Sequence, residues 1–450
     1  MTTSVIRNRR LLKQTRALTL LLIAVAMVVP FRAPSAVHAT NTTESTIVLQ
    51  TTGAPLLQST SQVINNGPAN QTNPHVDCNL VSYTNDDFQG QSTVRYKDLV
   101  TGSDNLVLGN DVDLLSDISG SHVAYTEVDF PGDRLMVFDT SSQTRTVVPG
   151  LGRSNPSIGG NLVAFEDRGA DRHEPQIAVY DLTTGIVTPL TDDSLRNLRP
   201  IISPTGNAVV WEKCQTTGLA CSLYSAVQTS PGVFTTRALT EENGGAHWIS
   251  TDGVNAVYTS SRTGESDVYY QNLVDGSEVH LAIPGNQRAT SISGNLITFS
   301  SESQNGYDVF LYDIRSESLF QVTNTIEDEN LPEINICNGV ARIVYVSPGD
   351  GAFDAYAVSF PAPTVVEDQL GDLIVLIKGF NLPHGTENSL VTKLQQALTA
   401  MEAGNQPQAC SLLADFTNEC TAQSGKKLTA EQATQLINAA NLIKTNVGCQ

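Results

Sequence analysis

Three side chains that could work together chemically are spread widely along the chain: His75, Asp117 and Glu333. Each stands directly before an aliphatic residue that precedes a turn. One imidazole with two carboxylates could bind a divalent cation or carry out acid–base catalysis. The alternative is structural, because such groups also hydrogen-bond to one another where two elements meet. The elements that position these residues must therefore be considered first.

The three residues belong to a pattern that recurs from about residue 70 to residue 360. Each copy is typical of four short strands with Gly, Asn, Asp and Ser in the turns, as in NPSIGGNLVAFEDRGADRHEPQIAVYDLTTGIVTPLTDD at 155–193. The aliphatic residues before the first turns recur every 40 to 47 residues: Val76, Ile118, Ile158, Ile202, Ile249, Ile292 and Ile334. Four strands per unit of about 40–45 residues indicate β-propeller blades, so the pattern predicts an all-β, seven-bladed propeller.

The seventh copy contains three strands and lacks a fourth. The early stretch SQVINN at 61–66 is similar to FQVTNT at 320–325, the fourth strand of the sixth copy. We therefore predict that a strand around Gln62–Val63 completes the last blade and closes the ring, which also protects its edges. Closure makes Glu333, His75 and Asp117 neighbours on three consecutive blades. The residues directly before the seven aliphatic residues given above are His75, Asp117, Ser157, Ile201, Trp248, Ser291 and Glu333.

The cysteines fit an exported chain with disulfide bonds. Cys78 and Cys337 occupy nearly the same turn on the first and last blades, so we predict a bond that clasps the ring. Cys214 and Cys221 flank QTTGLA in a hairpin, where a cross-strand bond fits. Cys410 and Cys449 fit a bond that ties down the last helix, which leaves Cys420 unpaired. The sequence has no CxxC pair, which argues against a structural zinc site.

Residues 1–39 have the features of a secretory signal peptide, with a basic start, a short apolar run and small residues before a cleavage site. They hold six basic and no acidic residues, so their removal changes the net charge from −20 to −26. Such a charge argues against nucleic acid as a partner. We expect a secreted or extracellular protein, with cell-surface attachment as a variant, and no transmembrane segment after cleavage. An uncleaved membrane anchor is the alternative.

After residue 360 the apolar pattern changes from period 2 to period 3.6. Four segments predict helices, with a Thr N-cap before ENSLV in the second and a capping box between Thr429 and Gln432 in the fourth. A small C-terminal four-helix domain is expected. The predicted organisation is a signal peptide at 1–39, a linker at 40–60, a propeller at 61–360 and the helical domain at 361–450.

The stretches SPTGNAVVW at 203–211 and SSRTGESDVYYQNLVDG at 260–276 resemble the TolB-like propeller family. This resemblance covers about 290 residues and implies a fold that often serves as a binding platform. The segments NLPHGTENSLVTKLQQAL, AGNQPQACSLLADFTN and QSGKKLTAEQATQLINAANLI resemble the FIMAH domain, a C-terminal module of exported bacterial proteins. That resemblance implies surface display or attachment and points to no particular activity.

Acidic residues are frequent in the loops before the innermost strands, which all emerge on one face of a propeller. An acidic face of this kind would attract Ca²⁺ or a basic partner, or would simply keep the loops soluble. No loop has the alternating ligand pattern of a dedicated calcium site. We expect no organic cofactor, with Ca²⁺ as the candidate ion. The acidic residues are Asp111, Asp113, Asp192, Asp193, Glu241, Glu242, Glu327, Asp328 and Glu329.

The sequence contains no GxSxG, HExxH or P-loop motif. We therefore expect a non-enzymatic binding or scaffold protein that uses one propeller face to bind an extracellular or cell-envelope protein or glycan. The alternative is a hydrolase or lyase that acts on extracellular carbohydrate at the channel mouth through His75, Asp117 and Glu333. A glycan-binding module is a third option, although aromatic residues form only 6% of the chain and offer few stacking platforms.

Overall fold

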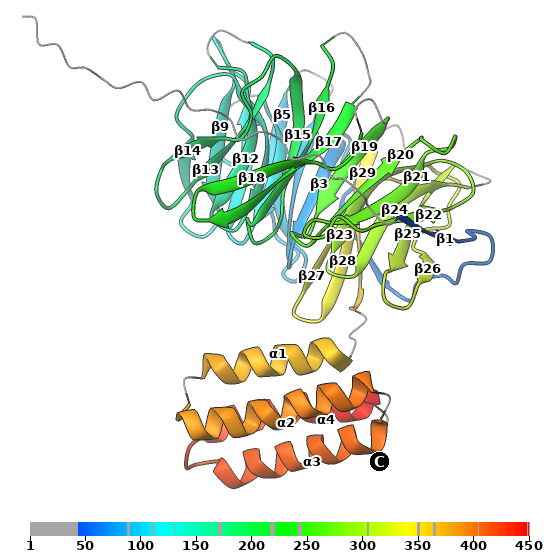
Figure 1. Cartoon of the computed structure of the whole chain (residues 1–450). Coiled ribbons are helices and arrows are strands. Elements are labelled where there is room, and N and C mark those ends of the chain that lie inside the picture. The colour runs from blue at the N-terminus through cyan, green and yellow to red at the C-terminus, as the bar shows by residue number, and fades with distance from the viewer. Residues whose placement is uncertain are drawn as a thin grey trace, which may run out of the picture. The chain divides into compact units, whose positions relative to one another are not determined.

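The structure is a computed structural model, and it describes residues 44–87, 91–109, 112–129, 131–169, 173–216, 221–241, 245–303, 306–348, 352–362, 366–380, 382–403, 405–447 and 449. The predicted signal peptide lies outside these residues. Seven antiparallel sheets follow one another along the chain, each with four strands in the blade arrangement (Figure 1). The predicted seven-bladed propeller is therefore confirmed, and four helices follow it.

The first four blades are formed by consecutive strands, with the innermost strand first. Their strands are β3 (Asn70–Asp77), β4 (Leu80–Asp86), β5 (Ser92–Asp98) and β6 (Asp104–Leu106); β7 (Asp113–Ser119), β8 (His122–Glu127), β9 (Arg134–Asp139) and β10 (Thr144–Val147); β11 (Arg153–Gly159), β12 (Leu162–Asp167), β13 (Gln176–Asp181) and β14 (Val187–Pro189); and β15 (Arg196–Ile202), β16 (Ala208–Cys214), β17 (Cys221–Ser230) and β18 (Val233–Ala238).

Blades five to seven follow the same order, but blades five and seven also take a strand from the N-terminal segment. Their strands are β19 (Ala246–Thr251), β20 (Asn255–Ser260), β21 (Asp267–Asn272) and β22 (Glu278–Ala282) with β1 (Glu44–Val48); β23 (Gln287–Ser293), β24 (Leu296–Glu302), β25 (Tyr307–Asp313) and β26 (Ser318–Gln321); and β27 (Asn330–Cys337), β28 (Val340–Pro348) and β29 (Phe353–Pro361) with β2 (Thr60–Asn65).

The ring closes as predicted. Strand β2 pairs antiparallel with β29, with Gln62 opposite Ala357 and Val63 opposite Tyr356. Cys78 and Cys337 form a disulfide bond across the same seam, with their Cα atoms 5.0 Å apart. The other two predicted bonds, Cys214–Cys221 and Cys410–Cys449, are also present, and Cys420 is free and buried.

The segment that we expected to be a linker contains structure. Strand β1 lies beside β22 and pairs with it in parallel, as a fifth strand of blade five (Figure 1). Farther along, the backbone nitrogen of Leu57 donates to the carbonyl oxygen of Gln321 in β26 at 2.8 Å. The N-terminal segment thus follows the outer edges of blades five, six and seven. Its strand was not evident from the sequence because four of the five β1 residues are exposed, which leaves no alternating pattern.

The core is divided into layers between neighbouring blades. One cluster of buried residues joins blade seven to blade one and includes Ile64, Tyr83 and Val344. Other clusters fill the remaining six interfaces in the same way. The two middle strands of each blade are therefore covered on both faces, which explains their nearly continuous apolar sequences. Burial of this apolar surface is the main stabilising contribution to the ring.

Every innermost strand contains a β-bulge at the same place. At each bulge the pairing register shifts, and one residue has a positive φ between 51° and 56°. A bulge bends its strand and redirects the side chain next to it. We call the seven bulge residues the rim residues: Asn73, Leu115, Asn155, Arg199, Trp248, Ala289 and Leu331.

The C-terminal domain consists of helices α1 (Val366–Gly379), α2 (His384–Glu402), α3 (Gln406–Gln423) and α4 (Ala430–Val447). They enclose a core of their own that includes Leu373, Leu394 and Phe416. The predicted capping box is confirmed, since the backbone nitrogen of Gln432 donates to Thr429 Oγ1 at 3.1 Å and Thr429 N donates to Gln432 Oε1 at 3.0 Å. The N-cap predicted in α2 is wrong, because this helix begins one turn earlier with Pro383 at its N-cap.

Candidate functional site at the mouth of the central channel

The innermost strands of all seven blades surround a cavity of about 580 Å³, which is the mouth of the central channel. All seven rim residues line it, because each bulge turns the strand at the same height. Arg199 and Trp248 are the two rim residues that are exposed, whereas the other five are buried or half-buried. They come from adjacent blades, four and five. The cavity also contains His75, Asp117 and Glu333.

The structure brings the three predicted side chains together at the seam of the ring. His75 Nδ1 lies 2.5 Å from Glu333 Oε2 and 3.5 Å from Asp117 Oδ1. The other Glu333 oxygen accepts from Val76 N at 2.9 Å. Asp117 accepts from its own neighbour Ile118 N at 2.7 Å and from Ile158 N of the next blade at 2.8 Å. All four carboxylate oxygens therefore accept hydrogen bonds from the backbone or from His75.

Charge and burial shift the protonation of this group. Burial alone would lower the pKa of His75, but the charges of Glu333 and Asp117 outweigh it and raise the pKa to about 9. Burial raises the pKa of Asp117 to about 6, against the opposing influence of His75. At neutral pH the group is an imidazolium ion held between two carboxylates.

The same position forms blade-to-blade hydrogen bonds elsewhere in the ring. Ser157 Oγ accepts from Ile202 N at 3.1 Å, and Ser291 Oγ accepts from Ile334 N at 3.3 Å. Glu333 and Asp117 make the same contact with carboxylates in place of hydroxyls. The seam group therefore does what serines do at other junctions, which supports the structural alternative. Its donor atoms also lie within 4.8 Å of one another, a spacing that a divalent cation could bridge.

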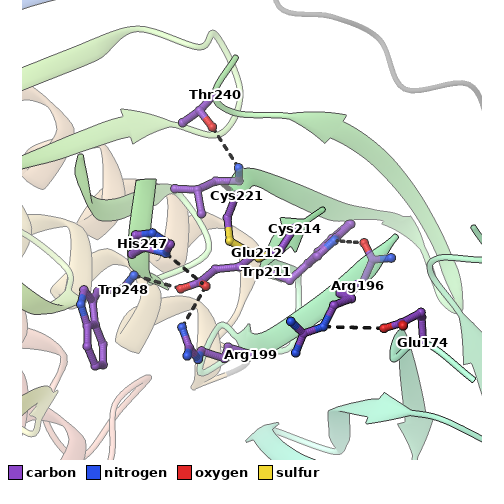
Figure 2. The surroundings of a disulfide bond; sticks show 12 residues. Glu174, Arg196, Arg199, Trp211, Glu212, Cys214, Cys221, Thr240, His247 and Trp248 are labelled. Carbon is purple, nitrogen blue, oxygen red and sulfur yellow. Dashed lines mark hydrogen bonds and ion pairs between the residues drawn. A yellow bond between two sulfur atoms is a disulfide. The ribbon is translucent and has the colours of Figure 1, made fainter. Parts of the chain in front are cut away.

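A second group of charges, which the sequence analysis missed, lies between blades four and five (Figure 2). Glu212 of β16 is 2% exposed and accepts from Trp248 N at 3.1 Å and from Arg199 Nη1 at 2.9 Å. His247 Nδ1 lies 3.5 Å from the same carboxylate. Although burial would raise the pKa of Glu212, His247 and Arg199 hold it below its usual range. One buried carboxylate thus holds the side chain of Arg199 and the backbone of Trp248.

The guanidinium carbon of Arg199 lies 5.9 Å from the centroid of the Trp248 ring, within the range of a cation–π contact. Blade three supports Arg199 from the other side, since Glu166 Oε1 accepts from Arg199 N at 2.9 Å. Cys221 also lies near Glu212 and His247, and the three offer metal-ligand atoms within 4.8 Å. Cys221 is bonded to Cys214, however, so its sulfur is not a thiolate that could hold zinc.

The structure corrects the alignment of blade five. Trp248 does not occupy the position of His75 and Glu333, because it is the bulge residue and corresponds to Asn73 and Leu331. Ser250 takes the position of His75, and Thr251 rather than Ile249 takes the position of Val76. The sequence alignment of this blade was two residues out of register, because the blade has a threonine where the other six blades have an aliphatic residue.

The predicted acidic face is smaller than the sequence indicates. Asp192, Asp193, Glu241, Glu327 and Asp328 are exposed. Asp113 and Glu329 are buried and belong to the interior, where Glu329 accepts from the hydroxyls of Thr323, Thr325 and Ser347. Asp111 and Glu242 lie outside the described residues.

No family model matches the chain, and no curated protein matches it. The resemblances to TolB-like propellers and to FIMAH domains therefore remain predictions. No helix among the described residues combines the length and apolar character needed to cross a membrane.

Solved propellers are similar in fold. The β-propeller domain of the Trilobed protease from Pyrococcus furiosus has a TM-score of 0.51 at 8% identity, and the match covers 65% of this chain and 95% of that one. The oligogalacturonate lyase from Vibrio parahaemolyticus has a TM-score of 0.51 at 14% identity, and the match covers 68% of this chain and 94% of that one. A puromycin-hydrolyzing peptidase of Mycobacterium tuberculosis has a TM-score of 0.50 at 13% identity, and the match covers 66% of this chain and 52% of that one.

These similarities show the fold alone. The Pyrococcus domain is described as having an open velcro topology, whereas β2 closes the ring of this chain. All three neighbours are enzymes or domains of enzymes. A propeller is a scaffold for many unrelated functions, however, so the site itself must decide.

Proposed function

We propose that the chain is a non-catalytic binding protein whose ligand contacts Trp248 and Arg199 at the mouth of the channel. One observation carries this proposal. The two exposed rim residues lie within cation–π distance of each other, and the buried carboxylate of Glu212 accepts both from the side chain of Arg199 and from the backbone nitrogen of Trp248. An aromatic ring beside an arginine at a cavity is typical of a binding site, and the hydrogen bonds that hold the backbone of Trp248 and the side chain of Arg199 reduce the conformational entropy lost when a ligand binds.

The hydrogen bonds of the seam group favour binding over catalysis. A general base must be basic enough to take a proton, and the hydrogen bond that each carboxylate oxygen of Glu333 and Asp117 already accepts makes these oxygens weaker bases. His75 is protonated at neutral pH and so cannot accept a proton there. We propose that the partner is an extracellular or cell-envelope molecule, in keeping with three disulfide bonds and the predicted signal peptide.

The enzymatic alternative, a hydrolase or lyase acting on carbohydrate, remains the second candidate. Two observations favour it: the solved neighbours are enzymes, and His75 lies in the cavity beside two carboxylates. In this alternative His75 as imidazolium would be the general acid. Substitution of His75 would then abolish turnover, whereas in our proposal it affects stability alone.

The test is retention of ligand from extracellular and cell-envelope fractions by the immobilised chain without residues 1–39. We expect the wild type to retain a component that Trp248→Ala does not retain. Tyr307→Ala is the matched control, since Tyr307 also lies against an arginine, Arg288 at 3.5 Å, but does not line the cavity. Equal retention by Trp248→Ala would overturn the proposal. Release of shortened or unsaturated sugars, lost in His75→Gln, would establish the enzyme.

Calcium binding by the exposed acidic loops stays a prediction. A thermal shift with millimolar Ca²⁺ would test it, and an unchanged unfolding temperature would count against a cation site.

A further inference from the structure

We propose that the ligand of the Trp248–Arg199 pair is an uncharged saccharide, bound with one sugar ring stacked on the indole of Trp248. The inference rests on the proposed function, because it names the class of molecule that this same site would take. It depends on three features of the rim: the conformation of Trp248, the pairing of the charges, and the mixture of polar groups in the cavity.

Folding alone does not explain a tryptophan at position 248. The bulge requires the left-handed conformation there, with φ at 56°, which asparagine adopts readily and a bulky side chain adopts at a cost. Asn73 and Asn155 fill the same position in blades one and three, and Leu115 and Leu331 fill it in blades two and seven, where they are half-buried. Trp248 is also 41% exposed, so a large part of its apolar surface faces solvent. A residue that is unfavourable both for backbone and for solvation is expected where a ligand covers it.

The charges around the cavity favour an uncharged ligand. Arg199 is paired with Glu212 at 2.9 Å, and Arg196 lies 3.6 Å from Glu174. His75 is held between two carboxylates, and Glu166 adds a further negative charge to the lining. Every described cation of the lining therefore faces at least one carboxylate, and acidic groups outnumber basic ones. A carboxylate or phosphate on the ligand would meet net repulsion, which the acidic chain as a whole reinforces.

The remaining groups suit hydroxyls, which both donate and accept hydrogen bonds. The lining contains donors on Arg199, amides on Asn73 and Asn155, and the hydroxyl of Ser154. Arg199 has five N–H donors and uses one of them on Glu212. The cavity of about 580 Å³ lies within the range of about 300–1,000 Å³ that is usual for small ligands. An aromatic face surrounded by mixed donors and acceptors matches the apolar face and hydroxyl edge of a sugar ring.

The test uses the fluorescence of the two tryptophans in the chain without residues 1–39. Trp211 is fully buried and donates to Asn197 Oδ1 at 3.0 Å, so acrylamide quenching reports mainly on Trp248. An array of neutral and acidic glycans selects candidates, and each is titrated while quenching is measured. We expect at least one neutral oligosaccharide to protect Trp248 from acrylamide, while oligogalacturonate of the same length does not.

Variants separate the site from the fold. Trp248→Ala should weaken binding of the neutral glycan tenfold or more, Trp248→Phe should retain part of it, and Tyr307→Ala should leave it unchanged. Binding of acidic glycans alone would overturn the inference. So would the absence of any bound glycan while Trp248 is still needed for retention from cell fractions, a result that leaves the proposed function standing. Failure of both assays would remove the proposed function as well.

Discussion

Two junctions of the ring use buried or half-buried carboxylates in different ways. At the seam of blades seven, one and two, Glu333 and Asp117 accept from backbone nitrogens and from His75. Between blades four and five, Glu212 also accepts from the backbone, but its second partner is the exposed Arg199. The carboxylates of the seam close the ring, whereas Glu212 holds two side chains at its surface. A cluster of titratable side chains in a channel is therefore not evidence of catalysis until the hydrogen-bond partners of those side chains are known.

The largest difference between the two junctions should appear on removal of their disulfide bonds. Cys78–Cys337 joins residues 259 apart and Cys214–Cys221 joins residues 7 apart, so the first constrains the unfolded chain much more. We expect Cys78→Ser with Cys337→Ser to lower the free energy of unfolding by about 5 kcal/mol, and Cys214→Ser with Cys221→Ser by about 2 kcal/mol. Denaturant unfolding without reductant measures both. Equal losses would mean that β2 and its packing close the ring unaided.

The seam should also depend on pH in a way that the rim does not. The pKa of His75 is raised from 6.5 to about 9, so its contribution is complete below pH 6.5 and is lost as the pH rises through about 9. Asp117 titrates near pH 6, below this window. We expect His75→Gln to be less stable than the wild type by up to about 3 kcal/mol at pH 6.5, and the gap to close by pH 10. Unfolding curves across that range test this, and a constant gap would contradict it.

Alanine in place of each glutamate compares the two junctions directly. Glu212→Ala and Glu333→Ala should each cost about 1–3 kcal/mol of folding stability, since each leaves a partly buried backbone nitrogen unpaired. Ligand retention should distinguish the two variants. Glu212→Ala should retain at least tenfold less ligand than the wild type, because the side chain of Arg199 and the backbone of Trp248 are no longer held, whereas Glu333→Ala should retain as much as the wild type. Loss of retention in Glu333→Ala would place the seam group in the site and favour the enzyme.

Repetition made the fold predictable. Seven copies of one pattern predicted the number of blades. The similarity of SQVINN to FQVTNT predicted the closing strand, and two cysteines in equivalent turns predicted the disulfide bond across the seam. Strand β1 was missed because an exposed strand that adds in parallel to an outer edge has no periodic signal. The neighbourhood of His75, Asp117 and Glu333 followed from ring closure, but their hydrogen bonds to the backbone did not, since sequence does not show where a side chain points.

The rim was missed for a different reason. The bulge is a backbone feature, and its seven residues share a conformation rather than a residue type. Asparagine at two of the seven positions was the one signal, because asparagine tolerates the left-handed region. An alignment based on the bulge rather than on an aliphatic residue would have placed Trp248 with the other six rim residues, and so would have shown it to be the one aromatic side chain among them.

The smallest expected change is the most direct test of what Trp248 is for. Trp248→Asn places at the bulge the residue that two other blades use, so the backbone should relax and the protein should be equally stable or gain about 0.5 kcal/mol. The same variant should lose ligand retention at least tenfold, because the stacking surface is gone. Thermal unfolding and retention are measured on one preparation, with Tyr307→Ala as the control. A loss of more than about 1 kcal/mol would show that the indole packs for stability. Stability that is kept or gained while binding is lost is the pattern of a residue selected for function at the expense of folding.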